Sequence, residues 1–265
     1  MDVSRGPEPV YVLAGYIATV GHWNRFRTEW LRMLAEYDAP LFSPADLDLK
    51  DKNGNRIGLY KGWSDEKALA FQQRAFSIIK RRRRVAISSS ILTDQMHLHF
   101  AWMKKKKDDR QEGLARFYVH ATKAFLEHVR NWIKRYRVKD PIHYVFERGD
   151  EGYDEINSAL GHIIKDPKQS ALFNLASYTN ANKKDHCFIQ LQAAGIWAYE
   201  VYKHVANQFV TTPPIEPRAS FKVLMRKYDE PFNTVYTKTD FDNLVEAYRK
   251  QGGTLLDPRT GTQIF

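Results

Sequence analysis

The sequence predicts an α/β protein in which helices flank a mixed sheet. Short apolar segments rich in β-branched and aromatic residues alternate along the chain with longer segments whose apolar residues recur every three or four positions. The first pattern is typical of buried strands and the second of amphipathic helices. Their alternation favours one sheet with helices packed on it.

The first 92 residues predict two strands and two helices. Residues 2–9 are polar and contain glycine and prolines, so we expect a loop there. A turn-rich segment with Asn53-Gly54 at its tip separates the two helices, and Ser64 is placed to cap the second one. The predicted elements are a strand at 10–18, a helix at 23–37, a helix at 64–79 and a strand at 85–92.

The rest of the chain predicts a long helix at 114–136, a strand at 142–147, a helix at 153–164 and a strand at 171–179. A helix at 187–205 carries one buried face, formed by Leu191, Ala194, Ala198, Val201, Tyr202 and Val205. Prolines break the structure after residue 210, and Thr239 with Asp242 forms a capping box for a last helix. We therefore expect one domain at 1–210, with a proline-rich connection and a C-terminal helical extension at 211–265 packed on it.

Composition narrows the class of protein. Of the 265 residues, 43% are hydrophobic, which suffices for a sizeable core. The single cysteine, Cys187, rules out an intramolecular disulfide and a cysteine-based zinc site, and it agrees with a reducing compartment. The longest apolar run, at 10–18, is much shorter than the roughly 20 residues of a membrane span, and no signal peptide opens the sequence. We expect a cytoplasmic protein outside the membrane.

The charge of the chain indicates an anionic partner. There are 41 Lys and Arg against 31 Asp and Glu, giving a formal charge of +10. A basic surface attracts polyanions, so nucleic acid is the first partner to consider. Much of the excess lies in two runs, at 80–84 and 104–107, and such runs also occur as solvated edges.

Several familiar sites are missing from the sequence, including glycine-rich phosphate loops, the nucleophile elbow and the helical two-histidine zinc motif. Cys187 next to His186 is interpreted as a buried structural thiol at a helix start. His97 and His99 would point the same way on extended backbone, but no third metal ligand accompanies them.

The segment at 142–152 is the most informative. Its strand delivers Glu147 to the strand end, after which Arg148 and the following residues turn the chain away from the sheet. Ligand sites gather at strand ends in α/β sheets, and a carboxylate there is the oxygen ligand that Mg²⁺ or Mn²⁺ prefers. The alternative is a capping or salt-bridged glutamate.

Three segments carry a resemblance to a known family. In order, they are VYVLAGYIATVGHWNRFRTEW at 10–30, YVFERGDEG at 144–152 and IQLQAAGIWAYEVYK at 189–203. Together they resemble the bacterial and phage family of unknown function numbered 3800 (DUF3800), over most of residues 1–235. The resemblance implies a ribonuclease H-like fold.

The resemblance also implies a cluster of acids that holds divalent metal ions for phosphodiester cleavage. Glu147 matches the acid of the central strand, and Asp2 matches an aspartate at the end of the first strand. The strand before Asp2 would precede Met1, so we expect a sheet that lacks it and either exposes an edge or depends on a partner, such as a second copy. Gly195 stands where the family has an aspartate. Asp185, which lies just before this helix, is a better candidate than Glu200 to replace the missing metal ligand.

We therefore expect a nuclease-like hydrolase that uses Mg²⁺ or Mn²⁺ and is weakened at Gly195. The resemblance implies Glu147 and Asp2 as catalytic residues and metal ligands, with Asp185 as a further ligand. The basic residues near these motifs, which would contact phosphates, are Arg148, Lys183 and Lys184. The alternatives are a nucleic-acid-binding protein that no longer cuts, and a protein-interaction module that pairs through an exposed sheet edge.

Overall fold

The computed structural model describes residues 1–5, 8–94, 109–148 and 153–250, and it confirms the α/β class. One sheet has four strands in the order β1-β2-β3-β6, comprising β1 (Asp2–Arg5), β2 (Val10–Ile17), β3 (Val85–Leu92) and β6 (Asn233–Tyr236). Strands β1 and β3 are antiparallel to β2, and β6 is parallel to β3. A second sheet pairs β4 (Ile142–Glu147) in parallel with β5 (Leu175–Ala181).

Met1 joins the two sheets. Its amino group donates to the carbonyl oxygen of Val145 at 2.6 Å, and the backbone N–H of Glu147 donates to the carbonyl oxygen of Met1 at 3.1 Å. One residue bonded to two positions on its neighbour is the pattern of adjacent parallel strands. The start of β1 therefore lies between β2 and the end of β4.

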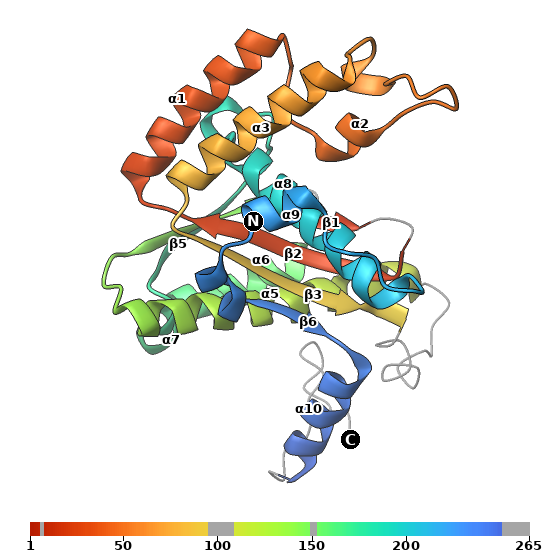
Figure 1. Cartoon of the computed structure of the whole chain (residues 1–265). Coiled ribbons are helices and arrows are strands. Elements are labelled where there is room, and N and C mark those ends of the chain that lie inside the picture. The colour runs from red at the N-terminus through yellow and green to blue at the C-terminus, as the bar shows by residue number, and fades with distance from the viewer. Residues whose placement is uncertain (6–7, 95–108, 149–152, 251–265) are drawn as a thin grey trace.

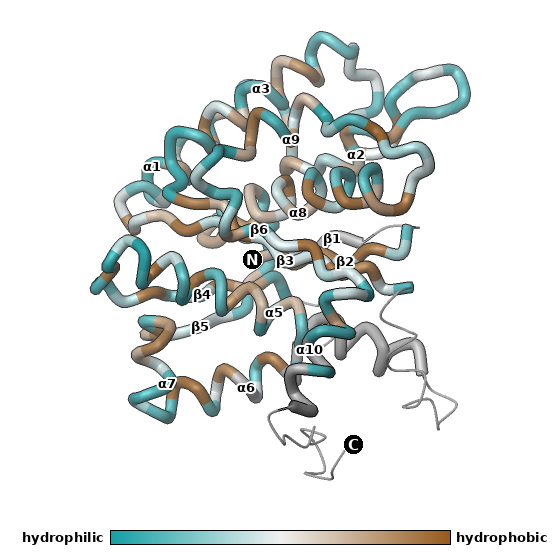
Figure 2. Tube along the Cα trace, turned by 60° about the horizontal axis from the view of Figure 1, so that its bottom comes forward, coloured by the Kyte–Doolittle hydropathy of each residue, from teal (hydrophilic) through white to brown (hydrophobic). Residues whose placement is uncertain are grey.

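Helices cover both faces of this arrangement (Figure 1). On one side lie α8 (Leu191–Val205) and α9 (Ala219–Leu224), with α1 (Val20–Tyr37) and α3 (Asp65–Arg82) beyond them. On the other side lie α5 (Asp109–Tyr136) and α6 (Tyr153–Lys165). Figure 2 shows these two helical layers with the strands between them.

The side chains of β2 explain why its sequence is apolar throughout. Val10, Val12 and Ala14 belong to the core shared with α8, whereas Tyr11 and Leu13 belong to the core shared with α5. Successive side chains of a strand point to opposite faces, and both faces are covered by helices here. The strand is therefore buried on both sides.

The shorter elements connect this framework. They are α2 (Pro44–Asp48), η1 (Gly58–Tyr60), α7 (Pro167–Leu172), η3 (His186–Phe188), the π-helical turn η4 (Ala206–Val210), η5 (Lys227–Phe232) and α10 (Lys238–Lys250). Within the described ranges, no helix combines the length and apolarity needed to cross a membrane.

Most predicted elements are confirmed, including the Ser64 cap, whose side chain accepts from the N–H of Lys67. The predicted loop at 2–9 is wrong for residues 2–5, because their backbone groups pair with β2 regardless of their polar side chains. The predicted strand at 171–179 begins only at Leu175, after α7. The last helix begins two residues earlier than expected, because Thr237 rather than Thr239 pairs with an aspartate three residues on, Asp240.

The segment after residue 211 contributes to the main sheet and core. It supplies β6, which the sequence did not predict, and it buries Phe221 and Leu224 against α8. Asp229 in η5 forms a fully buried ion pair with Arg83, at 2.7 Å between Nη1 and Oδ2. The C-terminal helix is present as α10.

Candidate functional site

Glu147 lies where three segments of the chain meet. It ends β4, its backbone bonds to Met1, and its side chain is only 8% exposed. Its Oε1 accepts a hydrogen bond from the backbone N–H of Lys183, at 3.4 Å, in the loop after β5. The acid predicted at a strand end is therefore held between the start of β1 and the ends of β4 and β5.

Gln192 connects this point to α8. It lies in the first turn of that helix and is 2% exposed. Its Nε2 donates to the carbonyl oxygen of Lys183 at 2.9 Å, while its Oε1 accepts from the indole N–H of Trp30 and the backbone N–H of Phe42, both at 2.9 Å. One amide thus fixes the loop beside Glu147 to α8, α1 and the segment before α2.

The sequence analysis did not single out Gln192. The available signal was a long polar side chain in the first turn of a helix whose other early residues are almost all small or apolar. Buried amides are hydrogen-bonded in nearly every case, so such a position predicts partners from other elements. Which elements supply them depends on the tertiary packing.

The three predicted phosphate-contacting residues lie on the loops that flank Glu147. Arg148 and Lys184 are exposed, and Lys183 is half-buried. The backbone N–H of Arg148 donates to the carbonyl oxygen of Ala181 at 2.9 Å, which holds the two loops together. Since β4 and β5 are parallel, both loops leave the sheet at the same edge, where ligand sites of α/β sheets gather.

The other positions of the expected metal site, Asp2, Gly195 and Asp185, lie on three different elements. The backbone of Asp2 opens β1 opposite Ala14, and its side chain lies outside the described residues. Gly195 is partly exposed in α8. The Asp185 carboxylate is exposed and caps η3 by accepting from the N–H of Cys187 at 2.8 Å.

The described residues do not assemble a metal site of the expected kind. Within the described ranges, no three His, Cys, Asp or Glu side chains come close enough together to hold an ion. A two-ion site needs several carboxylates to offset its charge. Among the described side chains, Glu147 is the carboxylate that lies between the start of β1 and the ends of β4 and β5. The described residues therefore do not fit a two-ion centre.

Two further expectations concern cysteine and histidine. The prediction that Cys187 is buried is wrong, because η3 precedes α8 and leaves the thiol exposed. His97 and His99 lie outside the described residues.

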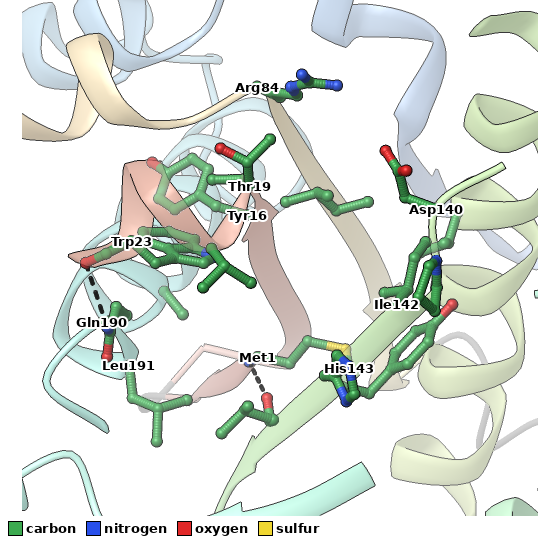
Figure 3. Close-up of a pocket in the computed structure, with 18 of the residues that line it drawn as sticks. Met1, Tyr16, Thr19, Trp23, Arg84, Asp140, Ile142, His143, Gln190 and Leu191 are labelled. Carbon is green, nitrogen blue, oxygen red and sulfur yellow. Dashed lines mark hydrogen bonds between the residues drawn. The ribbon is translucent and has the colours of Figure 1, made fainter. Parts of the chain in front are cut away.

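A pocket of about 540 Å³ is lined by Met1 and by the first residues of β4 (Figure 3). The end of β2 and the start of β4 form two of its sides, with Tyr16 on one strand and Ile142 and His143 on the other. Most of its lining is apolar, and the charged residues Arg84 and Asp140 are among the lining residues. The imidazole Nδ1 of His143 lies 2.6 Å from the hydroxyl oxygen of Ser177 on β5.

Comparison with protein-family models, with curated proteins and with solved structures finds no match to this chain.

Proposed function

We propose that this protein binds nucleic acid at the edge of the sheet that carries Glu147, on a ribonuclease H-like fold whose metal site is reduced. The observation that carries the proposal is the hydrogen-bonded series from Met1 through Glu147 and Lys183 to Gln192. It connects the resembling segments at 144–152 and 189–203, and Trp30 of the segment at 10–30 donates to the same Gln192 side chain. A mixed sheet covered by helices on both faces also supports it.

The charges at this edge suit a phosphate backbone. Arg148, Lys183 and Lys184 surround the meeting point on two neighbouring loops, and the chain carries a formal charge of +10. Contacts of Lys and Arg with phosphates position a nucleic acid without reading its sequence. We therefore expect salt-sensitive binding with little sequence preference.

Binding ranks ahead of cleavage because of the carboxylates. The described residues supply Glu147 alone at the meeting point, and Gly195 removes a further acid that the family resemblance implies. Loss even of a group that only orients a metal ligand commonly costs 10- to 100-fold in metal affinity or activity. The basic loops do not depend on a metal and keep their role in binding.

The test is fluorescence anisotropy with labelled single- and double-stranded DNA and RNA, measured between 50 and 200 mM KCl. The triple variant Arg148→Ala, Lys183→Ala, Lys184→Ala removes the proposed contacts. Each phosphate contact with duplex DNA contributes about 0.9 to the slope of log affinity against log salt, so the slope should fall by about 3. Lys183→Ala keeps the backbone bond to Glu147, which is made by the main-chain N–H.

A matched control removes the same charge elsewhere. Lys52, Lys61 and Lys139 are exposed and belong to other segments than the two loops, so their triple alanine variant should change the slope much less. Equal losses for the two triple variants would show that binding is diffuse and would contradict the assignment of this edge. Absence of binding in the unmodified protein at 50 mM salt would overturn the proposed function.

Metal-dependent cleavage is the second candidate. It is favoured by the bond from Glu147 to the carbonyl of Met1, because Asp2 is the next residue along the chain. The same oligonucleotides are incubated with protein in Mg²⁺ or Mn²⁺. Turnover that disappears in Glu147→Gln and rises in Gly195→Asp would support cleavage, and turnover unchanged in Glu147→Gln would exclude this site.

A further inference from the structure

Three basic segments of the chain lie side by side near the start of β3. They are residues 80–84 at the end of α3, residues 134–137 at the end of α5, and residues 226–230 at the start of η5. Helix η5 contacts both β3 and α5. The guanidinium of Arg226 donates to the carbonyl oxygen of Lys80, and the rings of Tyr136 and Phe232 lie 6.5 Å apart between centroids. Segments that are distant in the sequence therefore form one surface.

This surface differs from the edge that carries Glu147. Arg84 lines the pocket of Figure 3 together with Asp140 and Ile142, which lie at the start of β4. Glu147 ends that strand, and its 6 residues span about 20 Å. The basic surface and the proposed nucleic-acid edge therefore lie toward opposite ends of β4.

The arginines in the middle of the basic run that ends α3 have partners within the protein. Arg83 turns inward and pairs with the buried Asp229. Arg81 and Arg82 share the carboxylate of Glu29. The run is therefore not a uniformly solvated edge, and only its two ends are left to meet a partner.

Seven basic side chains of the three segments take part in no ion pair within the described residues. They are Lys80, Arg84, Lys134, Arg135, Arg137, Arg226 and Lys227. Arg226 is half-buried and the others are exposed. The acids of these segments are Asp229, which is paired inside, and Glu230, which is exposed. Cations that are gathered without matching acids attract a polyanion.

Two tyrosines are exposed within the basic surface. Tyr136 is 47% and Tyr228 is 43% exposed. The guanidinium carbon of Arg135 lies 5.9 Å from the ring centroid of Tyr136, and that of Arg226 lies 5.5 Å from the ring centroid of Tyr228. Each ring thus offers a planar face for a nucleobase next to a cation for a phosphate.

We propose that this basic surface binds single-stranded nucleic acid, with phosphates on the seven cations and bases stacked on Tyr136 and Tyr228. Proteins that bind single strands combine a basic surface along the backbone with aromatic rings under successive bases, and both are present here. The proposal shares with the proposed function the class of partner, but it uses a different surface.

A single strand suits the surface better than a duplex or a membrane. In a duplex each base pair presents only its edges in the grooves, so the tyrosine rings would find no base face on which to stack. Surfaces that bind anionic membranes insert Trp, Phe or Leu side chains. The large apolar side chains exposed on the described parts of these segments are the two tyrosines alone.

The first test removes the rings. Affinities for a labelled oligonucleotide of about 12 nucleotides, single-stranded or in a duplex, are measured by fluorescence anisotropy. The double variant Tyr136→Leu, Tyr228→Leu should bind the single strand at least about fivefold more weakly, since that factor corresponds to the lower limit for one stacked base. Its affinity for the duplex should stay nearly unchanged. Phe209→Leu is the matched control, because Phe209 is 48% exposed and lies outside the three segments.

The second test removes charge and locates the contact. The triple variant Lys80→Ala, Arg84→Ala, Lys227→Ala should lower the slope of log affinity against log salt by about 2, at about 0.7 for each phosphate contact with a single strand. The control variant at Lys52, Lys61 and Lys139 should change it much less. A single strand carrying 5-iodouracil should crosslink to Tyr136 or Tyr228, as identified by mass spectrometry.

Three results would overturn the proposal. Equal losses of single-strand and duplex affinity in the tyrosine variant would show that the rings do not stack on bases. Unchanged nucleic-acid binding in both variants of the basic surface, with weaker binding in the triple variant of Arg148, Lys183 and Lys184, would place the nucleic acid at the Glu147 edge alone and leave the proposed function standing. Loss of binding to phosphatidylserine vesicles in the charge variant, with nucleic-acid binding unchanged, would assign the surface to a membrane.

The reverse pattern would separate the two proposals in the other direction. Weaker binding in the variants of the basic surface, with no change in the variant of Arg148, Lys183 and Lys184, would support this surface and contradict the assignment of the Glu147 edge. Absence of any nucleic-acid binding by the unmodified protein at 50 mM salt would overturn both.

Discussion

Replacing Gln192 with methionine tests whether one buried amide holds the candidate site together. Methionine is similar in length and fits a buried position, but it cannot donate or accept the three strong hydrogen bonds of the glutamine. The substitution leaves the indole N–H of Trp30, the backbone N–H of Phe42 and the carbonyl of Lys183 without their partner.

The cost follows from the burial of those groups. Trp30 is 0% and Phe42 2% exposed, so both donors lose their bond without access to water. Each such group costs about 1–3 kcal/mol. Lys183 is half-buried, and its carbonyl adds less. We expect the free energy of unfolding to fall by about 3–5 kcal/mol, a large part of the 5–15 kcal/mol typical of a folded protein.

The assay is urea unfolding followed by circular dichroism, with Gln190→Met as the matched control. Gln190 is half-buried and makes one long hydrogen bond, from Nε2 to the carbonyl oxygen of Trp23 at 3.4 Å, so its replacement should cost less than about 1 kcal/mol. If Gln192→Met lowers the free energy of unfolding no more than the control does, the reasoning that this buried amide holds α8, α1 and the Lys183 loop together is refuted.

Three further predictions concern stability. Asp229→Ala leaves the buried Arg83 guanidinium without its counter-ion and should cost about 3–5 kcal/mol in urea unfolding; a loss under 1 kcal/mol would contradict this. Burial lowers the pKa of His128 below its ordinary value, so below about pH 6.5 the unfolded chain binds a proton that the folded one does not. The wild type should therefore lose stability relative to His128→Gln between pH 7 and 5. Curves of unfolding free energy against pH that run parallel for the two proteins would contradict this prediction. Gly54 has φ +83 and Gly21 lies in the first turn of α1, and both have open space around an added Cβ. In thermal unfolding, alanine should therefore destabilise the protein by about 1 kcal/mol at Gly54 and stabilise it by up to about 1 kcal/mol at Gly21. Stability changes of the same sign at the two positions would refute the backbone argument.

Elements are predicted correctly where the sequence pattern that specifies them lies within a few neighbouring residues. The strand at 85–92 and the helix that follows Ser64 are confirmed because periodicity and a capping residue lie within a few positions of each other. Strand β6 and strand β1 were missed because their sequences are short and partly polar, and pairing with a buried neighbour decides their conformation.

The candidate site shows the same division. The sequence placed Glu147 at a strand end and the basic residues on the loops beside it, because strand and turn patterns are local. It gave no indication that Gln192 would bond to Lys183, Trp30 and Phe42, since those partners come from three distant segments.

By itself, the sequence determined the α/β class, the helices and strands with strong apolar periodicity, and the basic character of the protein. Only the tertiary structure decided that Met1 joins two sheets, that the first turn of α8 meets the end of β4, and that a pocket lies between the end of β2 and the start of β4. The physical reason is that hydrophobic periodicity is fixed by neighbouring residues, whereas strand order and buried polar contacts are fixed by which distant surfaces pack together.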